Sequence, residues 1–404
     1  MTSANEARTI IVDQAPKMPA EVIPLLQAHR RILAKDVAAT QDIPLFDNSS
    51  MDGFALQAVD TITAQQSAPI LLNVVGEILA GGMFPGVLPS RSAARIMTGA
   101  PIPRGADAVL EQEAVTTKNG SVNVAMAVNA GRNIRKRGED IAAGSTVFAK
   151  GTLLQSAHLG ALASIGVVTV PVFRRPSVAF LTTGNELVNI EETPVGGQIR
   201  NSNAYSLWGL IQESGAIPHS LGTARDSETE LLEKLSEGLK YDLLLTSGGV
   251  SVGTHDLVLS ALKQLGVEVK FWKVNIKPGM PLVFGVYRHH EHMVPVFGLP
   301  GNPVSTMVTF QQFVRPALLA MMGSSNDSTI RLKARMKDEF RKKDGKRHFI
   351  RGIVRNENGA LVVETTGTQS SGALTSMTKA NCFVVIPEQR MEVHAGEEVE
   401  IELL

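Results

Sequence analysis

Residues 242–256, which read DLLLTSGGVSVGTHD, combine an apolar run with a loop that could bind an anion. Glycines let backbone N–H groups approach phosphate oxygens, and the N-terminus of a following helix adds positive potential. The small residues that could face the anion are Ser247, Gly248, Gly249, Ser251 and Gly253. Their spacing matches neither G-x-G-x-x-G nor a P-loop. A tight turn with Asp256 as helix cap is the alternative, and this stretch alone does not decide between the two.

Three carboxylates, Glu186, Asp226 and Asp256, each come shortly after a predicted strand. Oxygen ligands on loops suit Mg²⁺, which keeps several waters and bridges to phosphate. A metal ion held there could polarise a phosphoanhydride and neutralise a leaving group. As alternatives, Asp226 and Asp256 could cap helices, and Glu186 could be a solvated surface residue.

Two lysines, Lys273 and Lys277, flank a strand end and a turn in KVNIKPG. Beside an anion-binding loop, two such point charges would clamp a phosphate or a similar oxyanion. The run 135–137 is basic, and a solvated hairpin tip is an equal alternative there. The basic residues around Asp344-Gly345 are expected only to decorate a solvated turn; they are Arg341, Lys342, Lys343, Lys346 and Arg347. Likewise, His289, His290 and His292 are expected to decorate a turn and not to bind a metal ion.

The elements that must position these residues lie in 174–323, where apolar strands alternate with amphipathic helices. Such alternation predicts crossover connections and a parallel sheet. Three of the strands end in small-residue loops at 183–184, 247–249 and 299–301. Because such loops share one edge of an open α/β sheet, we expect a ligand to bind there. A capping box at Ser227 and Glu230 is expected to begin one of the helices.

Outside this region, residues 45–150 and 327–404 are predicted to be mostly β. Residues 20–34 are expected to form one amphipathic helix, and 159–173 a buried helix followed by a strand. The region 45–150 contains an Asn119-Gly120 hairpin turn, and 327–404 contains turns at Asp344-Gly345 and Asn358-Gly359 before a final strand, EEVEIELL.

The composition limits the number of domains and the classes of function that the chain could have. A chain of 404 residues is long enough for two to four domains. Its 39 basic and 39 acidic residues cancel, which argues against a general nucleic-acid binder. Its one cysteine, Cys382, excludes internal disulfides and cysteine-held metal clusters and fits a reducing cytoplasm. Neither a signal peptide nor a run long enough to span a membrane is indicated.

Seven motifs in this chain closely resemble the MoeA family of molybdopterin molybdenumtransferases. They are SSMDGFAL (49–56), MTGAPIPRGADAV (97–109), NIRKRGEDI (133–141), TTGNEL (182–187), SGGVSVG (247–253), FWKVNIKPGMPLVFG (271–285) and GLPGNPVS (298–305). The order of SGGVSVG, KPGMP and GLPGNPVS is specific, and the resemblance runs from about residue 20 to the C-terminus.

The resemblance implies an α/β plus β, multidomain fold in a homodimer. Residues 1–44 and 146–173 would form an elongated segmental domain, and 45–145 a β-rich domain that covers the partner's cleft. Residues 174–326 would form the molybdopterin-binding α/β domain, and 327–404 a C-terminal β-barrel.

The implied reaction inserts molybdate into adenylylated molybdopterin and releases AMP, with Mg²⁺ or another divalent cation. Candidate catalytic residues are Asp52, Asp140, Glu186, Asp226, Asp256, Lys273 and Lys277, of which Glu186, Asp226 and Asp256 would hold the metal ion. Candidate substrate-binding residues are Thr98, Thr183, Gly184, Ser247, Gly248, Gly249, Ser251, Gly253, Pro300, Gly301, Asn302, Pro303 and Ser371. The roles of Asp52, Thr98 and Asp140 rest on the resemblance alone.

The chain departs from the common family pattern at Asn185, Asn201 and Ala204, which leaves open the metal count and a preference for tungstate. Molybdopterin adenylyltransferase is one alternative function, but that family usually has a T-x-G-G-T-G turn and lacks the β-rich and barrel regions. A receptor-clustering scaffold is another, which the absence of a fused second domain disfavours. The adenylyltransferase is also a possible protein partner, whereas neither nucleic acid nor a membrane is expected to be one.

Overall fold

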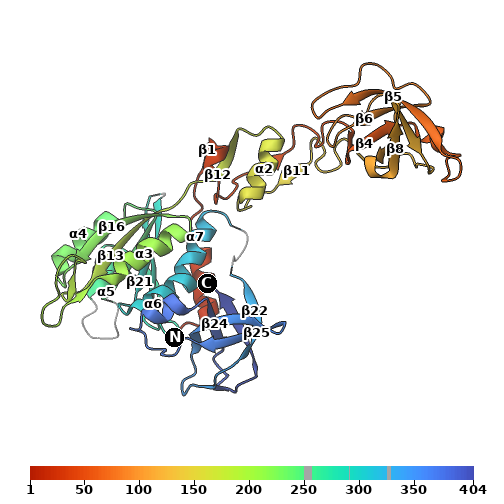
Figure 1. The fold of residues 1–404 in the computed structure, drawn as a ribbon. Helices are drawn as coiled ribbons and strands as arrows, with labels where there is room; N and C mark the ends of the chain where they lie inside the picture. The colour runs from red at the N-terminus through yellow and green to blue at the C-terminus, as the bar shows by residue number, and fades with distance from the viewer. Residues whose placement is uncertain (250–256, 291, 325–328) are drawn as a thin grey trace.

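The computed structural model describes residues 1–249, 257–290, 292–324 and 329–404 as an elongated molecule. Figure 1 shows an α/β unit and a β-barrel packed together at one end and a β-rich unit at the other. A narrow segment containing β1, α2, β11 and β12 joins the two ends. The predicted fold class, α/β plus β in several domains, is confirmed.

The α/β unit is built on a six-stranded sheet. In spatial order its strands are β16 (Ile217–Ala224), β13 (Ser177–Thr183), β17 (Leu243–Ser247), β21 (His292–Leu299), β20 (Val283–His289) and β18 (Glu268–Trp272). The first four run parallel, as predicted, and the last two add antiparallel partners. The histidines at 289, 290 and 292 lie at the β20–β21 turn. A short pair, β14 (Leu187–Val188) and β15 (Ile199–Arg200), lies outside this sheet.

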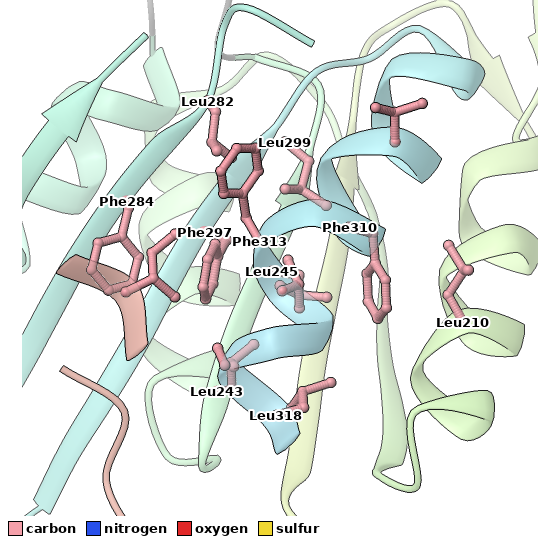
Figure 2. Packing of buried hydrophobic residues seen from close by; sticks show 14 of the residues in the cluster. Leu210, Leu243, Leu245, Leu282, Phe284, Phe297, Leu299, Phe310, Phe313 and Leu318 are labelled. Carbon is pink, nitrogen blue, oxygen red and sulfur yellow. The ribbon is translucent and has the colours of Figure 1, made fainter. Parts of the chain in front are cut away.

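Helices cover both faces of the sheet. One face packs against α3 (Ser202–Glu213), α6 (Pro303–Thr309), the π-helix η4 (Phe310–Val314) and α7 (Arg315–Met321); the other packs against α4 (Glu228–Gly238) and α5 (Leu257–Gln264). Leu243 and Leu245 point into the first core and Leu244 into the second. Figure 2 shows Phe310 and Phe313 near Leu245. The apolar run before the glycine loop is continuous because its strand is buried on both sides.

The predicted capping box of α4 is wrong. Ser227 stands at the N-cap, but its side chain makes no capping hydrogen bond. The helix is held instead by Leu231 and Leu235, which are buried against the sheet. Packing of an apolar face therefore replaces the local cap as the main stabilising contact.

The β-rich unit contains a second six-stranded sheet. In spatial order its strands are β7 (Ala108–Glu111), β4 (Gly53–Leu56), β6 (Ser92–Ile96), β5 (Ile70–Ile78), β9 (Ser121–Val124) and β8 (Val115–Lys118). The predicted turn joins β8 to β9, with positive φ at both Asn119 and Gly120. A short pair, β3 (Asn48–Ser49) and β10 (Ile134–Arg135), lies outside this sheet, as do the 3₁₀ turns η2 (Ala58–Thr61) and η3 (Gln112–Ala114).

The C-terminal unit is a closed five-stranded barrel. Its strands follow the order β24 (Arg347–Glu357), β25 (Ala360–Thr365), β22 (Arg331–Met336), β28 (Glu398–Leu403) and β26 (Cys382–Ile386), and β26 closes onto β24. The predicted turn at Asn358-Gly359 joins β24 and β25, and α8 (Thr375–Lys379) precedes β26. A short strand of the α/β unit, β19 (Ile276–Lys277), pairs with β24 and ties the two units together.

The predicted hairpin at Asp344-Gly345 is wrong. Before it, β23 (Phe340–Arg341) pairs with β27 (Glu392–Val393) and not with β24. Lys342 is buried, and its ammonium donates hydrogen bonds to the carbonyls of Lys346 and Pro387. The turn is therefore folded against the protein, because a buried lysine must find acceptors that a solvated one would find in water.

The predicted helix at 20–34 is also wrong. The N-terminal helix is α1 (Ala4–Asp13), which a reciprocal capping box between Ser3 and Glu6 begins. Residues 20–34 contain instead β1 (Ala20–Pro24) and the 3₁₀ turn η1 (Leu25–Gln27). Pro24 would interrupt a helix in this position, whereas it is tolerated at the end of a two-stranded sheet.

The narrow segment brings together parts of the chain far apart in sequence. Strand β1 pairs with β12 (Thr169–Phe173), and β2 (Val37–Ala38) pairs with β11 (Thr146–Phe148). The predicted helix and strand are confirmed as α2 (Ser156–Ser164) and β12. The chain thus enters the β-rich unit through β1 and β2 and returns through β11 and β12, which pair with them. This pairing holds the β-rich unit away from the other two units. None of the helices described is long and apolar enough to cross a bilayer.

The junction between this segment and the α/β unit depends on Gly323, and this generates a stability prediction. Gly323 has φ +73°, and an added Cβ would lie 2.3 Å from the ring of Phe173. Gly266, which also follows a helix, has φ +86° and open space around its Cβ position. We expect Gly266→Ala to cost roughly 1–2 kcal/mol of strain and Gly323→Ala about 1–3 kcal/mol more, through the clash. Equal shifts in denaturation midpoint for the two variants would contradict this account of the junction.

Candidate active site

Two hollows of opposite charge adjoin at the carboxyl edge of the α/β sheet. The first, here called the acidic pocket, has a volume of about 480 Å³ and is lined by Glu186, Asp226 and one arginine, Arg200. The second, here called the basic pocket, has a volume of about 870 Å³ and lies between KPGMP and the barrel. Pro281 lines both, so the pockets share a wall.

The acidic pocket gathers the three predicted strand-end loops. Its lining includes Thr183, Gly184, Ser247, Gly248, Gly249, Pro300, Gly301, Asn302 and Pro303. All are predicted substrate-binding residues, and the parallel order of β13, β17 and β21 places them side by side. Ser251, Gly253 and Asp256 lie outside the described residues.

The glycines of this loop are required by how closely the strand ends approach. Gly248 has φ +95°, and a Cβ there would lie 2.6 Å from the carbonyl oxygen of Thr183. A Cβ at Gly249 would lie 2.4 Å from Val258 on α5. The loop consists of glycines because the neighbouring backbone and helix fill the space that side chains would occupy. Since no side chain covers it, the loop backbone can line the pocket directly.

Glu186 and Asp226 face the acidic pocket from different loops. Both side chains are exposed, and neither forms an ion pair with a residue that the structure describes. Asn185 connects the two loops, because its Oδ1 accepts a hydrogen bond of 3.1 Å from the Asp226 backbone N–H. Oxygen donors of this kind suit Mg²⁺. Within the described ranges, however, no three His, Cys, Asp or Glu side chains are grouped closely enough to hold a metal ion.

The sequence pattern did not predict the role of Asn203. Its amide nitrogen donates to Ser247 Oγ at 2.9 Å and to the Gly301 carbonyl at 2.7 Å, which ties two loops to the start of α3. Its Oδ1 and the Thr183 hydroxyl are buried without a hydrogen-bond partner in the described part of the chain. Since buried polar groups are rarely left unpaired, these two atoms mark places where a ligand would complete the bonding.

Asn201, one of the departures from the family pattern, has a structural role. It is buried, caps α3 through a bond from the Ala204 N–H, and donates its amide to the hydroxyls of Thr182 and Thr223. A carboxylate could cap the helix but could not donate these two bonds. The local hydroxyl partners therefore fit an asparagine at this position.

The basic pocket concentrates positive charge in a chain whose charges cancel overall. Its lining includes six cationic side chains and one carboxylate, Asp344; the cations are Lys277, Arg341, Lys342, Lys343, Lys346 and Arg351. The prediction that the residues around Asp344-Gly345 only decorate a solvated turn is wrong for Arg341, Lys342, Lys343 and Lys346, whereas Arg347 does not line this pocket and pairs with Glu388. The barrel brings the turn against KPGMP, so its charges line a cavity.

Arg351 is the most deeply buried of these cations, with 1% of its surface exposed. Its guanidinium donates only to neutral oxygens, those of Ser376, Phe349 and Ser370, at 3.3–3.4 Å. Burial lowers the pKa of Arg351 to about 10, so it remains charged at neutral pH. A buried cation without a carboxylate partner among the described residues is costly, and an oxyanion in the pocket would compensate it.

The two predicted clamp lysines are separated. Lys277 reaches the basic pocket, where its Nζ lies 3.5 Å from Asp344 Oδ2. Lys273 lines neither pocket, and its Nζ lies 4.3 Å from the centre of the Trp272 ring in a cation–π contact. Ser371, predicted to reach the site from the barrel, lines the basic pocket together with Ser305.

Asp52, Thr98 and Asp140 lie on the β-rich unit. The backbone N–H and the hydroxyl of Thr98 both donate to Asp52 Oδ1, at 2.8 and 2.7 Å. These two bonds, the backbone one first, lower the pKa of Asp52. Asp140 is exposed. Figure 1 shows the β-rich unit at the opposite end of the chain from the α/β unit and the barrel, whose residues line both pockets, so within one chain these residues do not join Glu186 and Asp226.

Three family models match successive parts of the chain. Residues 2–166 match the MoeA N-terminal region (domains I and II), and 179–320 match a probable molybdopterin-binding domain. Residues 333–404 match the MoeA C-terminal region (domain IV). Together they cover nearly the whole chain.

Full-length relatives agree with these matches. The chain is 37% identical to a molybdopterin molybdenumtransferase of Haemophilus influenzae, over 100% of this chain and 98% of that protein. It is 34% identical to one of Bacillus subtilis, over 95% and 90%. Its structure is similar to the crystal structure of a molybdopterin biosynthesis moeA protein of Pyrococcus horikoshii, with a TM-score of 0.86, 32% identity and full coverage of both chains.

Arg351 generates a prediction about anion binding. We expect molybdate to raise the melting temperature of the wild-type protein, because a ligand that binds only the folded state stabilises it. Arg351→Met should lose most of that rise. Without molybdate it should melt at a similar or higher temperature, since an uncompensated buried charge is removed. Arg355→Met is the matched control, because Arg355 lies on the same strand but pairs with Glu364 at the surface. Equal molybdate-induced shifts in all three proteins would exclude Arg351 from the binding site.

Proposed function

Because this chain belongs to the MoeA family of molybdopterin molybdenumtransferases, we propose that it inserts molybdate into adenylylated molybdopterin and releases AMP. It is an enzyme of molybdenum cofactor biosynthesis, as its full-length relatives are. The observation that carries the finer proposal is the shared wall at Pro281 between pockets of opposite charge. Two substrates with different anionic groups need adjoining sites.

In this proposal the basic pocket holds molybdate. Arg351 and Lys277 supply the positive charge, and the hydroxyls of Ser305 and Ser371 supply neutral donors. Because Arg351 is held by barrel residues, it need not reorganise when the oxyanion enters. Burial strengthens its attraction for a dianion relative to that of a solvated arginine.

The acidic pocket would hold the phosphate-bearing end of the pterin substrate. The loops containing Gly248 and Gly301 line this pocket, and Asn203 fixes their spacing. Glu186 and Asp226 would hold a divalent cation, with Asp256 as a further candidate ligand. When bound, that cation would neutralise charge on the phosphoanhydride and on the departing AMP. Without it, two carboxylates would repel an anionic ligand, which supports the cation requirement.

We further propose that the enzyme is a homodimer and that Asp52, Thr98 and Asp140 serve the partner's pockets. The separation of the β-rich unit from the pockets of its own chain supports this arrangement. So does a group of exposed apolar side chains on and beside α3, formed by Ile190, Tyr205 and Trp208, which line one hollow and of which Trp208 is 44% exposed. Exposed apolar patches of this kind often mark an interface.

The supply of substrate and the cellular setting remain part of the proposal. A molybdopterin adenylyltransferase would produce the adenylylated substrate and is a candidate partner. A cytoplasmic location fits this role. The departures at Asn185 and Ala204 leave tungstate as an alternative substrate.

The acidic pocket generates a prediction about turnover. Glu186→Gln and Asp226→Asn should each lower the rate of AMP release by at least about 10- to 100-fold, as loss of a metal ligand or its support commonly does. Neither should shift the melting temperature, because neither carboxylate forms an ion pair in the described structure. Glu191→Gln, an exposed change on the loop that follows β14, is the control. Normal turnover in either pocket variant would count against the assigned role.

The composite site generates a mixing experiment. Asp52→Ala and Glu186→Ala homodimers should each be inactive, because every site lacks one residue. After free subunit exchange about half the dimers are heterodimers, and each has one intact site, so activity should recover to roughly a quarter of wild type. If both residues served one site within the same chain, every site would keep a lesion. Proven exchange without recovered AMP release would therefore remove the cross-subunit site.

A further inference from the structure

Asp344 is the one carboxylate among the described residues that line the basic pocket. Its two oxygens face different units of the protein. Oδ1 lies 2.7 Å from His348 Nε2 and 3.4 Å from the Lys346 backbone N–H, both in the barrel. Oδ2 lies 3.5 Å from Lys277 Nζ, at the end of β19 in the α/β unit. The cation expected to clamp the oxyanion therefore already faces a protein carboxylate.

His348 fixes this carboxylate in place. The imidazole is buried, with 5% of the residue exposed, and it packs edge-on against Phe340 at 5.6 Å between ring centres. Strand pairing places His348 directly opposite Lys277 across the β19–β24 ladder. From the other side of the turn, Lys342 is bonded to two backbone carbonyls. The turn that carries Asp344 is thus held at both ends, unlike a mobile surface side chain.

The charges around Asp344 keep it ionised. Burial raises the pKa of Asp344, but the hydrogen bond and charge of His348, the Lys346 N–H and the charge of Lys277 together lower it more. The other charged groups nearby are Lys342 on the turn and Arg347 on β24, and Arg347 pairs with Glu388 at 3.3 Å. Burial lowers the pKa of His348, and the bond to Asp344 only partly offsets this. At neutral pH a neutral imidazole therefore leaves the full charge of Asp344 facing Lys277.

We propose that Asp344 is an internal counter-ion that Lys277 exchanges for the incoming oxyanion, and that this exchange weakens oxyanion binding in the basic pocket. The proposal rests on the function proposed above, in which this pocket binds molybdate. An oxyanion must displace the carboxylate from Lys277 and is also repelled by it, and both effects oppose binding. Because the repulsion grows with the charge of the ligand, Asp344 weakens the binding of a dianion more than that of a monoanion.

The test is calorimetric titration of molybdate into the full-length wild type and into Asp344→Asn. We expect the variant to bind molybdate roughly tenfold more tightly, because one repulsive charge is removed from the pocket. Perchlorate, a monoanion, should also bind more tightly to the variant, but by a smaller factor, because repulsion by Asp344 scales with the charge of the anion. Asp344→Glu, which keeps the charge, should bind both anions as the wild type does, and Asp338→Asn is the control for a carboxylate of the same barrel outside the pocket.

A pH series separates this role from a merely structural one. As pH falls into the acidic range, protonation of His348 partly cancels the charge of Asp344, so wild-type molybdate affinity should rise. The sign follows from the lowered pKa of His348, since burial keeps the imidazole neutral at neutral pH and the neutral form is lost only below the ordinary histidine range. The molybdate affinity of Asp344→Asn should depend less on pH. Comparing the variant with the wild type at each pH removes any contribution from protonation of molybdate itself. A variant that only damaged the turn would bind molybdate more weakly at every pH.

The outcomes distinguish the two proposals. If Lys277→Met and Arg351→Met weaken molybdate binding but Asp344→Asn binds equally or more weakly, the pocket stands and the counter-ion role is excluded. If neither Lys277→Met nor Arg351→Met changes binding, molybdate does not use this pocket and both proposals fail. Should Asp344→Asn not fold, Asp344→Ala replaces it with the same expected tightening.

Discussion

The uncompensated buried charge of Arg351 is the constraint around which the barrel end of this enzyme is organised. Burying a guanidinium carries a desolvation cost that hydrogen-bond or ion-pair partners must offset. Here the partners that the structure describes are three neutral oxygens, at distances near the upper limit for a hydrogen bond. The structure keeps a cation in an unfavourable place beside further cations of the same pocket. Such an arrangement is tolerated because the barrel and the α/β unit supply extensive apolar burial elsewhere, and under the proposed function it would be compensated by a bound anion.

The opposite sign of the neighbouring pocket follows from a different part of the fold. Parallel strands end at one edge, and the loops after β13 and β16 carry Glu186 and Asp226 to it. The chain has no net charge, yet it separates its charges into two compartments that meet at Pro281. Separation at short range creates a local field that composition cannot reveal, and the proposed reaction, which joins two anions, would take place in that field.

The elongated shape has a chemical consequence. Pairing of β1 with β12 and of β2 with β11 makes a narrow connection that holds the β-rich unit away from the pockets. Within that unit, Asp52 accepts two hydrogen bonds from Thr98, which keeps the carboxylate ionised and oriented. An oriented carboxylate at the far end of a subunit is useful if a second subunit presents its cleft there.

The sequence by itself determined the alternation of strands and helices, the strand-end loops and the family, because these depend on local patterns: leucines buried on both faces of β17, and glycines where backbone approaches backbone. It correctly indicated that the loops of β13, β17 and β21 would meet, since parallel strands share an edge. It did not indicate that Lys273 would turn onto Trp272, that Asn203 would tie the loops, or that the turn around Asp344 would line a cavity. The tertiary structure decided these outcomes. Asn203 bonds to residues more than 40 positions away, and the turn around Asp344 lines a cavity because β19 pairs with β24; no local pattern encodes either contact. The contact of Lys273 with its neighbour Trp272 depends on the positive φ of 81° that Lys273 adopts in the folded chain.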